Sequence, residues 1–130
     1  MHEYAMTSDL LNLVLREAAT HHATKVLEVT VAIGALSLLD PDQVKFCYDI
    51  LTKNTLAEGS TLLMEEVEAE VTCSCGFSGA PPTIEGIYDH FLLPVMKCPE
   101  CGSALQVVKG REFTLLRVKL VKPQIPEVTG

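Results

Sequence analysis

Four of the five cysteines fall in two close pairs, and their spacing constrains this chain more than any other feature. Cys98 and Cys101 enclose two residues, which permits a tight turn, and Gly102 tolerates the positive φ that lets backbone N–H groups point at sulfur. Cys73 and Cys75 enclose only one residue, but positions i and i+2 of a strand project to the same face. We therefore predict one metal site built from both pairs.

The segment that carries these pairs is short and rich in loop residues. Residues 76–97, 22 in all, separate the pairs and include three prolines, which favour irregular backbone. Such a segment buries too little apolar surface to fold alone, so a structural Zn(II) would supply the missing stability. Four thiolates also bind iron, so a rubredoxin-like iron or redox protein is an alternative. A dithiol redox centre would require a helix that begins at Cys98, and Gly102 disfavours the start of a helix there.

Hydrophobic periodicity predicts an α+β fold. Apolar residues recur at helical spacing over residues 3–21 and 41–54. Alternation of apolar and polar residues predicts strands over 26–33, 63–71 and 116–120. The second strand carries an acidic row and the third a basic row, and these rows could face each other if the two strands pair antiparallel.

Composition and charge narrow the class of protein. With 48% hydrophobic residues, the 130-residue chain has enough apolar side chains for a core. Its 10 Lys and Arg against 17 Asp and Glu give a formal charge of −7, which argues against nucleic acid as a partner. No apolar run approaches the roughly 20 residues that span a bilayer, and the first residues lack a secretory signal. We therefore expect a cytoplasmic protein with no membrane partner. In that reducing compartment, paired cysteines are metal ligands rather than disulfides.

The amino terminus carries a second candidate metal site. The free amine of Met1, the deprotonated amide nitrogen of His2 and the Nδ1 atom of His2 can close two fused chelate rings, and Glu3 can approach the fourth corner. Square-planar nitrogen and oxygen donors suit Ni(II) or Cu(II) rather than Zn(II). The alternative is that Glu3 merely favours the positive end of the first helix.

The other histidines are weaker candidates. His21 and His22 close the first helix, where side chains that interact with the exposed carbonyls are favoured. His90 lies between the two cysteine pairs, within reach of a zinc site short of one ligand or of a second metal. We keep His90 as a candidate auxiliary metal ligand.

Short motifs spread along the chain carry a further signal. They are Met1-His2-Glu3 ahead of a helix, Ile33-Gly34-Ala35-Leu36-Ser37, Phe46-Cys47-Tyr48, Ala57-Glu58-Gly59 and Glu68-Ala69-Glu70. In this order, from Met1 to about Leu120, the chain resembles the HypA/HybF family of hydrogenase maturation nickel chaperones. The resemblance implies two helices on a small mixed β-sheet, with an inserted rubredoxin-like zinc ribbon and a C-terminal strand that returns to the sheet.

The resemblance also implies a role for each candidate site. Family members generally keep two residues between the first two cysteines, so the fourth zinc ligand would be Cys75 or His90. The remaining implied ligands are Met1, His2 and Glu3 for nickel and Cys73, Cys98 and Cys101 for zinc.

The implied organisation is a nickel-binding domain of residues 1–70 plus 111–122, a zinc-binding domain of residues 71–110 and a flexible tail of residues 123–130. Such a protein is not an enzyme. It would accept Ni(II) as cargo, work with a HypB-type nucleotide-hydrolysing nickel protein and help insert nickel into the large subunit of a NiFe hydrogenase, with a homodimer left open. The competing class is a zinc-ribbon protein-interaction module without nickel delivery.

Overall fold

The computed structural model describes residues 2–81 and 97–123, and the chain divides into two compact units. Unit 1 consists of Met1–Ile33, Leu39–Glu65 and Phe113–Gly130. Unit 2 consists of Gly34–Leu38 and Glu66–Glu112. Within the described ranges, no helix is both long enough and apolar enough to cross a membrane.

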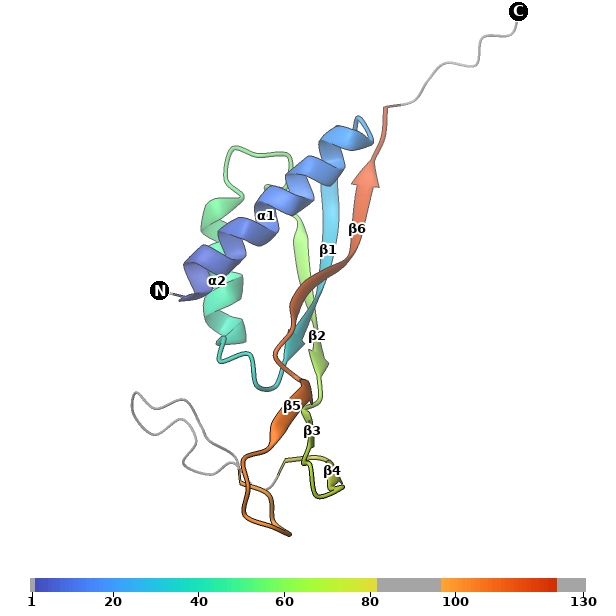
Figure 1. Ribbon diagram of the computed structural model, residues 1–130. Helices are drawn as coiled ribbons and strands as arrows, with labels where there is room; N and C mark the ends of the chain where they lie inside the picture. The colour runs from blue at the N-terminus through green and yellow to red at the C-terminus, as the bar shows by residue number, and fades with distance from the viewer. Residues whose placement is uncertain (1, 82–96, 124–130) are drawn as a thin grey trace, which may run out of the picture. The chain divides into compact units, whose positions relative to one another are not determined.

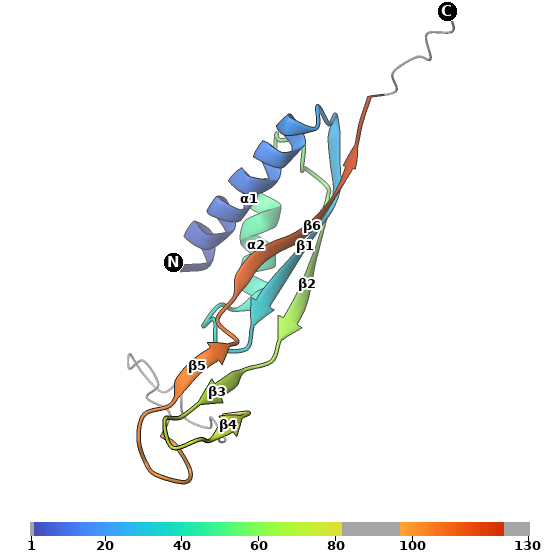
Figure 2. The same cartoon turned by 45° about the vertical axis from the view of Figure 1, so that its right-hand side comes forward.

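Unit 1 is built on a three-stranded sheet with strand order β2-β1-β6. β6 runs antiparallel to β1, whereas the arrows of β1 and β2 point the same way in Figure 1. Figure 2 shows both helices on one face of this sheet. This arrangement confirms the predicted α+β fold with two helices on a small mixed sheet. The elements are α1 (His2–Thr20), β1 (Lys25–Gly34), α2 (Pro41–Leu51), β2 (Thr61–Val67) and β6 (Phe113–Val121).

The helix boundaries follow from local chemistry. The Asp40 side chain accepts a hydrogen bond from the backbone N–H of Asp42 at 2.9 Å, and Pro41 occupies the first turn, so α2 starts where its capping signal predicts. α2 ends at Leu51, earlier than the predicted Asn54. The reason is that Asn54 adopts a left-handed conformation with φ 63°, which a helix cannot continue through.

The core of unit 1 lies between the helices and the sheet. Tyr48 of α2 is fully buried, and its hydroxyl bonds to Ser60, whose own hydroxyl donates to the Ala57 carbonyl. Burial raises the pKa of Tyr48 above its usual value. Cys47 is buried, as expected for a cysteine outside the metal pairs. The buried core residues are Leu10, Leu11, Val14, Ala18, Val26, Val29, Val31, Val44, Tyr48, Ala57 and Leu62.

The strand predicted over residues 63–71 is wrong as a single element. The chain forms β2 and then β3 (Glu70–Thr72), which belong to different sheets. The predicted pairing of the acidic strand with the last strand does not occur either, because β1 lies between them. The charges meet nevertheless, because Arg117 Nη2 reaches Glu65 Oε1 at 2.6 Å.

Unit 2 contains a second three-stranded sheet with strand order β4-β3-β5, in which both pairings are antiparallel. β4 (Ser78–Gly79) and β5 (Gln106–Lys109) flank β3. Among the described residues of this unit, the apolar cluster contains two buried residues, Leu36 and Val71, with four partly buried neighbours. A cluster of this size contributes little stability, so we expect the described part of unit 2 to depend on other interactions to hold its loops.

Gly34 and Gly110 allow separate segments of unit 2 to pack with their backbones in direct contact. A Cβ atom on Gly34 would lie 1.9 Å from the carbonyl oxygen of Gly110, and a Cβ on Gly110 would lie 2.8 Å from the Cα of Ala69. The Leu36 N–H donates to the same Gly110 oxygen at 2.6 Å. The Gly110 N–H donates to the Glu112 carboxylate at 2.6 Å, which lowers the pKa of that carboxyl.

We expect Gly34→Ala to destabilise unit 2 by about 1–3 kcal/mol, because the new methyl group overlaps backbone atoms that cannot rotate away. Leu38→Asn is the matched substitution in the same segment. Leu38 is exposed and has φ 64°, a conformation that Asn tolerates better than Leu, so that variant should be neutral or slightly stabilising. Urea unfolding, followed at the backbone amides of unit 2, measures the stability of each variant. Equal unfolding midpoints for the two variants would contradict the argument that a methyl group at position 34 overlaps the backbone.

Candidate metal centre

Cys73 and Cys75 lie on a tight turn that directly follows β3. The Cys73 N–H donates to the Phe77 carbonyl at 2.9 Å, and the Gly76 N–H donates to the Cys73 carbonyl at 3.0 Å. Gly76 has φ 105°, a value that L-residues rarely adopt. The expectation that this pair lies on one face of a strand is therefore wrong. The turn, and not strand periodicity, brings the two sulfurs together.

Cys98 and Cys101 lie on a second turn. The Cys98 N–H donates to the Ser103 carbonyl at 2.7 Å, and the Gly102 N–H donates to the Cys98 carbonyl at 2.9 Å. Gly102 has the predicted positive φ, 77°, and the Glu100 N–H points at Cys98 Sγ at 3.4 Å. Both observations confirm the local prediction for this pair. The described residues after Cys98 form turns rather than a helix, so the geometry that a dithiol redox centre requires is not formed here.

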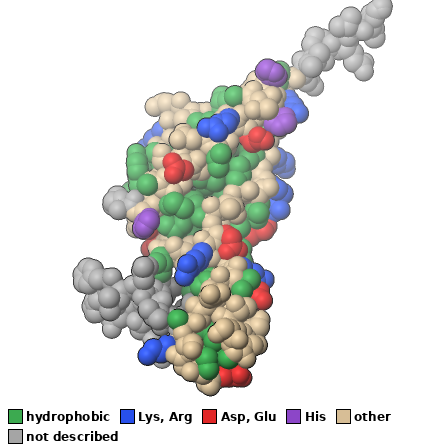
Figure 3. Space-filling model, in the orientation of Figure 1, with side chains coloured by type: hydrophobic (Ala, Val, Ile, Leu, Met, Phe, Trp, Pro, Cys, Tyr) green, Lys and Arg blue, Asp and Glu red, His purple; other side chains and the backbone are tan. Residues whose placement is uncertain are grey.

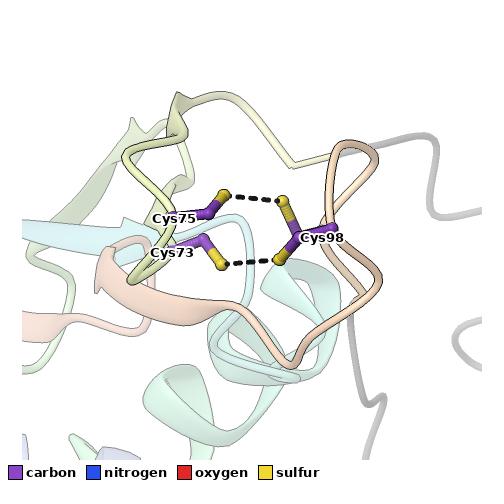
Figure 4. Close-up of side chains that lie close together, drawn as sticks. Cys73, Cys75 and Cys98 are labelled. Atoms are coloured by element: carbon purple, nitrogen blue, oxygen red, sulfur yellow. Dashed lines mark hydrogen bonds between the residues drawn. The ribbon is translucent and has the colours of Figure 1, made fainter.

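The two turns bring all four sulfurs into one cluster. Cys73 Sγ lies 3.4 Å from Cys101 Sγ, and Cys75 Sγ lies 3.6 Å from Cys98 Sγ. Figure 4 shows the side chains of Cys73 and Cys75 directed toward the opposite turn. All four ligand atoms lie within 4.8 Å of one another. Tetrahedral thiolates bonded to Zn(II) at about 2.3 Å stand about 3.8 Å apart, so the cluster suits a zinc ion.

The two exposed thiols of the cluster have pKa values shifted in opposite directions. The Phe77 N–H donates to Cys75 and favours its thiolate, but hydrogen bonds shared with the other sulfurs outweigh this and raise the pKa of Cys75 to about 12. The hydroxyl and backbone N–H of Ser103 donate to Cys101 and, with the neighbouring thiols, lower the pKa of Cys101 to about 6. Thiols this close share protons because adjacent thiolates repel. A divalent cation bound by the four sulfurs would take the place of those protons.

Ser103 is a residue that sequence reasoning missed. Its hydroxyl and backbone N–H both contact the Cys101 sulfur, so it orients that ligand from outside the cluster. The signal was available in principle, because a serine directly follows the glycine that closes the second turn.

The remaining candidate metal residues are not assembled with the cysteines. His2 is the exposed first residue of α1, and Glu3 follows it in the first turn. His21 lies 3.9 Å from Glu17 at the other end of the helix. Met1 and His90 lie outside the described residues. Among residues 2–81 and 97–123, the four cysteines are the one group of three or more His, Cys, Asp or Glu side chains placed to hold a metal.

The fold and this site define a small α+β protein with a four-cysteine metal centre held in a unit of its own. Comparison with known proteins identifies its family. The family model described as "Hydrogenase/urease nickel incorporation, metallochaperone, hypA" matches residues 1–120. The chain therefore belongs to the HypA family.

Individual relatives agree with this assignment. A "Hydrogenase maturation factor HypA" from Methanothermobacter thermautotrophicus is 41% identical over 123 residues, which cover 94% of this chain and 98% of the relative. A protein of the same name from Pyrococcus horikoshii is 35% identical, with coverage of 94% and 97%. The solution structure of the Ni metallochaperone HypA from Helicobacter pylori shares the fold, with a TM-score of 0.64, 22% identity and coverage of 93% of this chain and 98% of that chain.

Proposed function

We propose that this protein is a nickel metallochaperone that binds Ni(II) at its amino terminus and helps insert it into the large subunit of a NiFe hydrogenase. The observation that carries the proposal is the four-cysteine cluster in a chain of the HypA family that also begins Met1-His2-Glu3. Two chemically different donor sets then serve two different purposes. Nickel is cargo at a nitrogen-rich site, and zinc is a structural ion.

The position of His2 supports the nickel site. α1 begins at His2, and the first four N–H groups of a helix have no acceptor within the helix. The His2 amide can therefore lose its proton and bind a metal without breaking a helical hydrogen bond. The positive end of the helix also favours the negative charge of a deprotonated amide nitrogen. We assign the nickel ligands to the Met1 amine, the His2 amide and imidazole, and Glu3.

The cysteine cluster supports a separate, structural zinc site. We assign its ligands to Cys73, Cys75, Cys98 and Cys101, because their spacing leaves no open coordination position, and a closed thiolate cage releases its ion slowly. A donor set at a chain end forms and dissociates faster, which suits cargo. Free thiols persist in a reducing compartment, so we place this function in the cytoplasm.

The proposed role involves partners rather than catalysis. The relatives of this chain are named as maturation factors, and we infer from this that the chain is not an enzyme. The proposed partners are a HypB-type nucleotide-hydrolysing protein and the hydrogenase large subunit.

Direct transfer of nickel tests this function. Protein loaded with one equivalent of Ni(II) is mixed with the nickel-free large subunit of a NiFe hydrogenase and an excess of EDTA, and nickel in the separated large subunit is measured by mass spectrometry. We expect most of the metal to reach the large subunit, whereas EDTA should capture free Ni(II) added in place of the complex. His2→Ala should transfer none.

His21→Ala is the matched control, because it removes an exposed histidine that directly follows the opposite end of the same helix. It should transfer nickel as the parent protein does. Delivery by His2→Ala at the parent level would refute the amino-terminal site, and capture of all the nickel by EDTA would refute delivery itself.

A further inference from the structure

The outer edge of β6 is open among the described residues. β6 pairs with β1 on one side, and no described strand pairs with its other side. An edge strand presents a row of backbone N–H and C=O groups that can pair with an additional strand. β6 has nine residues, so its edge can take an extended segment about 30 Å long.

A groove beside this edge offers apolar surface. It has a volume of about 440 Å³ and lies between α1 and β6. Leu13 of α1 and Leu116 of β6 line it and are 48% and 43% exposed, respectively. Alternate side chains of an added strand would point to the helix side of the sheet, where these leucines could contact them.

The charge of the β6 edge is opposite to that of the whole chain. Residues 113–122 contain three basic residues and no acidic residue, whereas the chain carries 10 Lys and Arg against 17 Asp and Glu. Figure 3 shows Lys and Arg side chains gathered along the margin of the molecule that β6 forms. Arg16 adds a positive charge from the α1 side of the groove.

The carboxylates near this edge offset part of its charge, but among the described residues no ion pair within 4.0 Å involves Lys119 or Lys122. Glu65 pairs with Arg117 at 2.6 Å, and Glu17 lies 3.9 Å from His21. Glu28 lies on β1 and pairs in register with Lys119, so it is on the side of β6 that faces β1 and not on the outer edge. A strand added to the outer edge would have β6 residues as its cross-strand neighbours, and every charged residue of β6 is basic.

We propose that the β6 edge binds an extended segment of a partner protein in which apolar residues alternate with Asp or Glu. Backbone pairing supplies affinity, the groove receives the apolar side chains and the acidic side chains meet the basic ones of β6. A second copy of this chain is a poorer occupant, because pairing β6 with β6 places like charges on facing strands. This docking surface does not depend on which metals the protein binds.

A peptide titration tests the proposal. Isotope-labelled protein is titrated at low salt with a nine-residue peptide that alternates valine and glutamate, and backbone amides are followed by NMR. We expect shifts concentrated in residues 113–121, slower hydrogen exchange at β6 amides and weaker binding as salt is added. A peptide that alternates valine and lysine should bind at least about tenfold more weakly.

Charge reversal on the protein provides a matched pair of variants. Arg16→Glu with Lys119→Glu should weaken binding of the acidic peptide about tenfold. Lys45→Glu with Lys53→Glu makes the same change in net charge on and just after α2 and should alter the affinity less than twofold. Four outcomes would each overturn the proposal: absence of β6 shifts at millimolar peptide, equal binding of both peptides, occupation of the edge by a second copy in sedimentation experiments, and tighter binding of an oligonucleotide of equal charge.

Discussion

Acetylation of the Met1 amine is expected to lower nickel affinity by about 100-fold or more while leaving the fold and the zinc content unchanged. The amine, the His2 amide and the His2 imidazole act as one chelate, and removing one donor forfeits the effective concentration that the others gain from it. Calorimetry measures the affinity, and visible absorption reports square-planar coordination. Extension of the chain by a single residue would be a poor substitute, because histidine in the third position forms a chelate of its own.

Two variants separate this site from other histidines. His2→Ala should match the acetylated protein, because it removes the imidazole from the same chelate. His21→Ala should bind nickel with unchanged affinity, because His21 lies at the far end of α1. If acetylated and parent proteins bind nickel equally well, nickel lies elsewhere and the amino-terminal assignment fails, although membership of the HypA family stands.

Cys98→Ser is expected to abolish zinc binding and to unfold unit 2 while unit 1 stays folded. Cys98 is 4% exposed, and the apolar cluster formed by the described residues of unit 2 has two buried members. Structural zinc in small domains supplies on the order of 10 kcal/mol of apparent binding energy, far more than so small a core can provide. Unit 1 has eleven buried core residues and does not need the metal.

Metal analysis and amide hydrogen exchange measure the two parts of this expectation. Zinc should fall from one equivalent to none, and protection should vanish at Val71 and Val107 but persist in α1 and β1. Cys47→Ala is the matched control, because it removes the one cysteine outside the cluster. This variant should lower the stability of unit 1 slightly and should still bind one equivalent of zinc. Persistent protection at Val71 in Cys98→Ser would contradict a structural role, and a red chromophore in protein purified without oxygen would indicate iron instead of zinc.

The features that could be predicted from sequence are those decided over a few neighbouring residues. Helical periodicity and the capping signal at Asp40 place both helices, because the hydrogen bonds of a helix join residues four apart. The turn that carries Cys98 and Cys101 follows in the same way from their spacing and from Gly102. The cluster of four sulfurs was therefore predictable as a set, even though the reason given for Cys75 was wrong.

The features that sequence could not decide depend on contacts between distant segments. The alternation over residues 63–71 reads the same whether the strand stays in one sheet or passes into a second. The structure divides it between β2 and β3, where Gly110 fits against the backbone of Ala69. Strand order also places β1 between the acidic and basic strands and leaves β6 with an outer edge that no described strand covers.

The sequence by itself thus determined where both helices lie and which cysteines share a site, and it predicts a nickel site at the amino terminus. Only the tertiary structure decided how the strands divide between two sheets, which described strands lie at sheet edges and which described residues are buried. The physical reason is range: caps, turns and side-chain periodicity act between close neighbours, whereas sheet order and burial arise when segments far apart in the chain pack together.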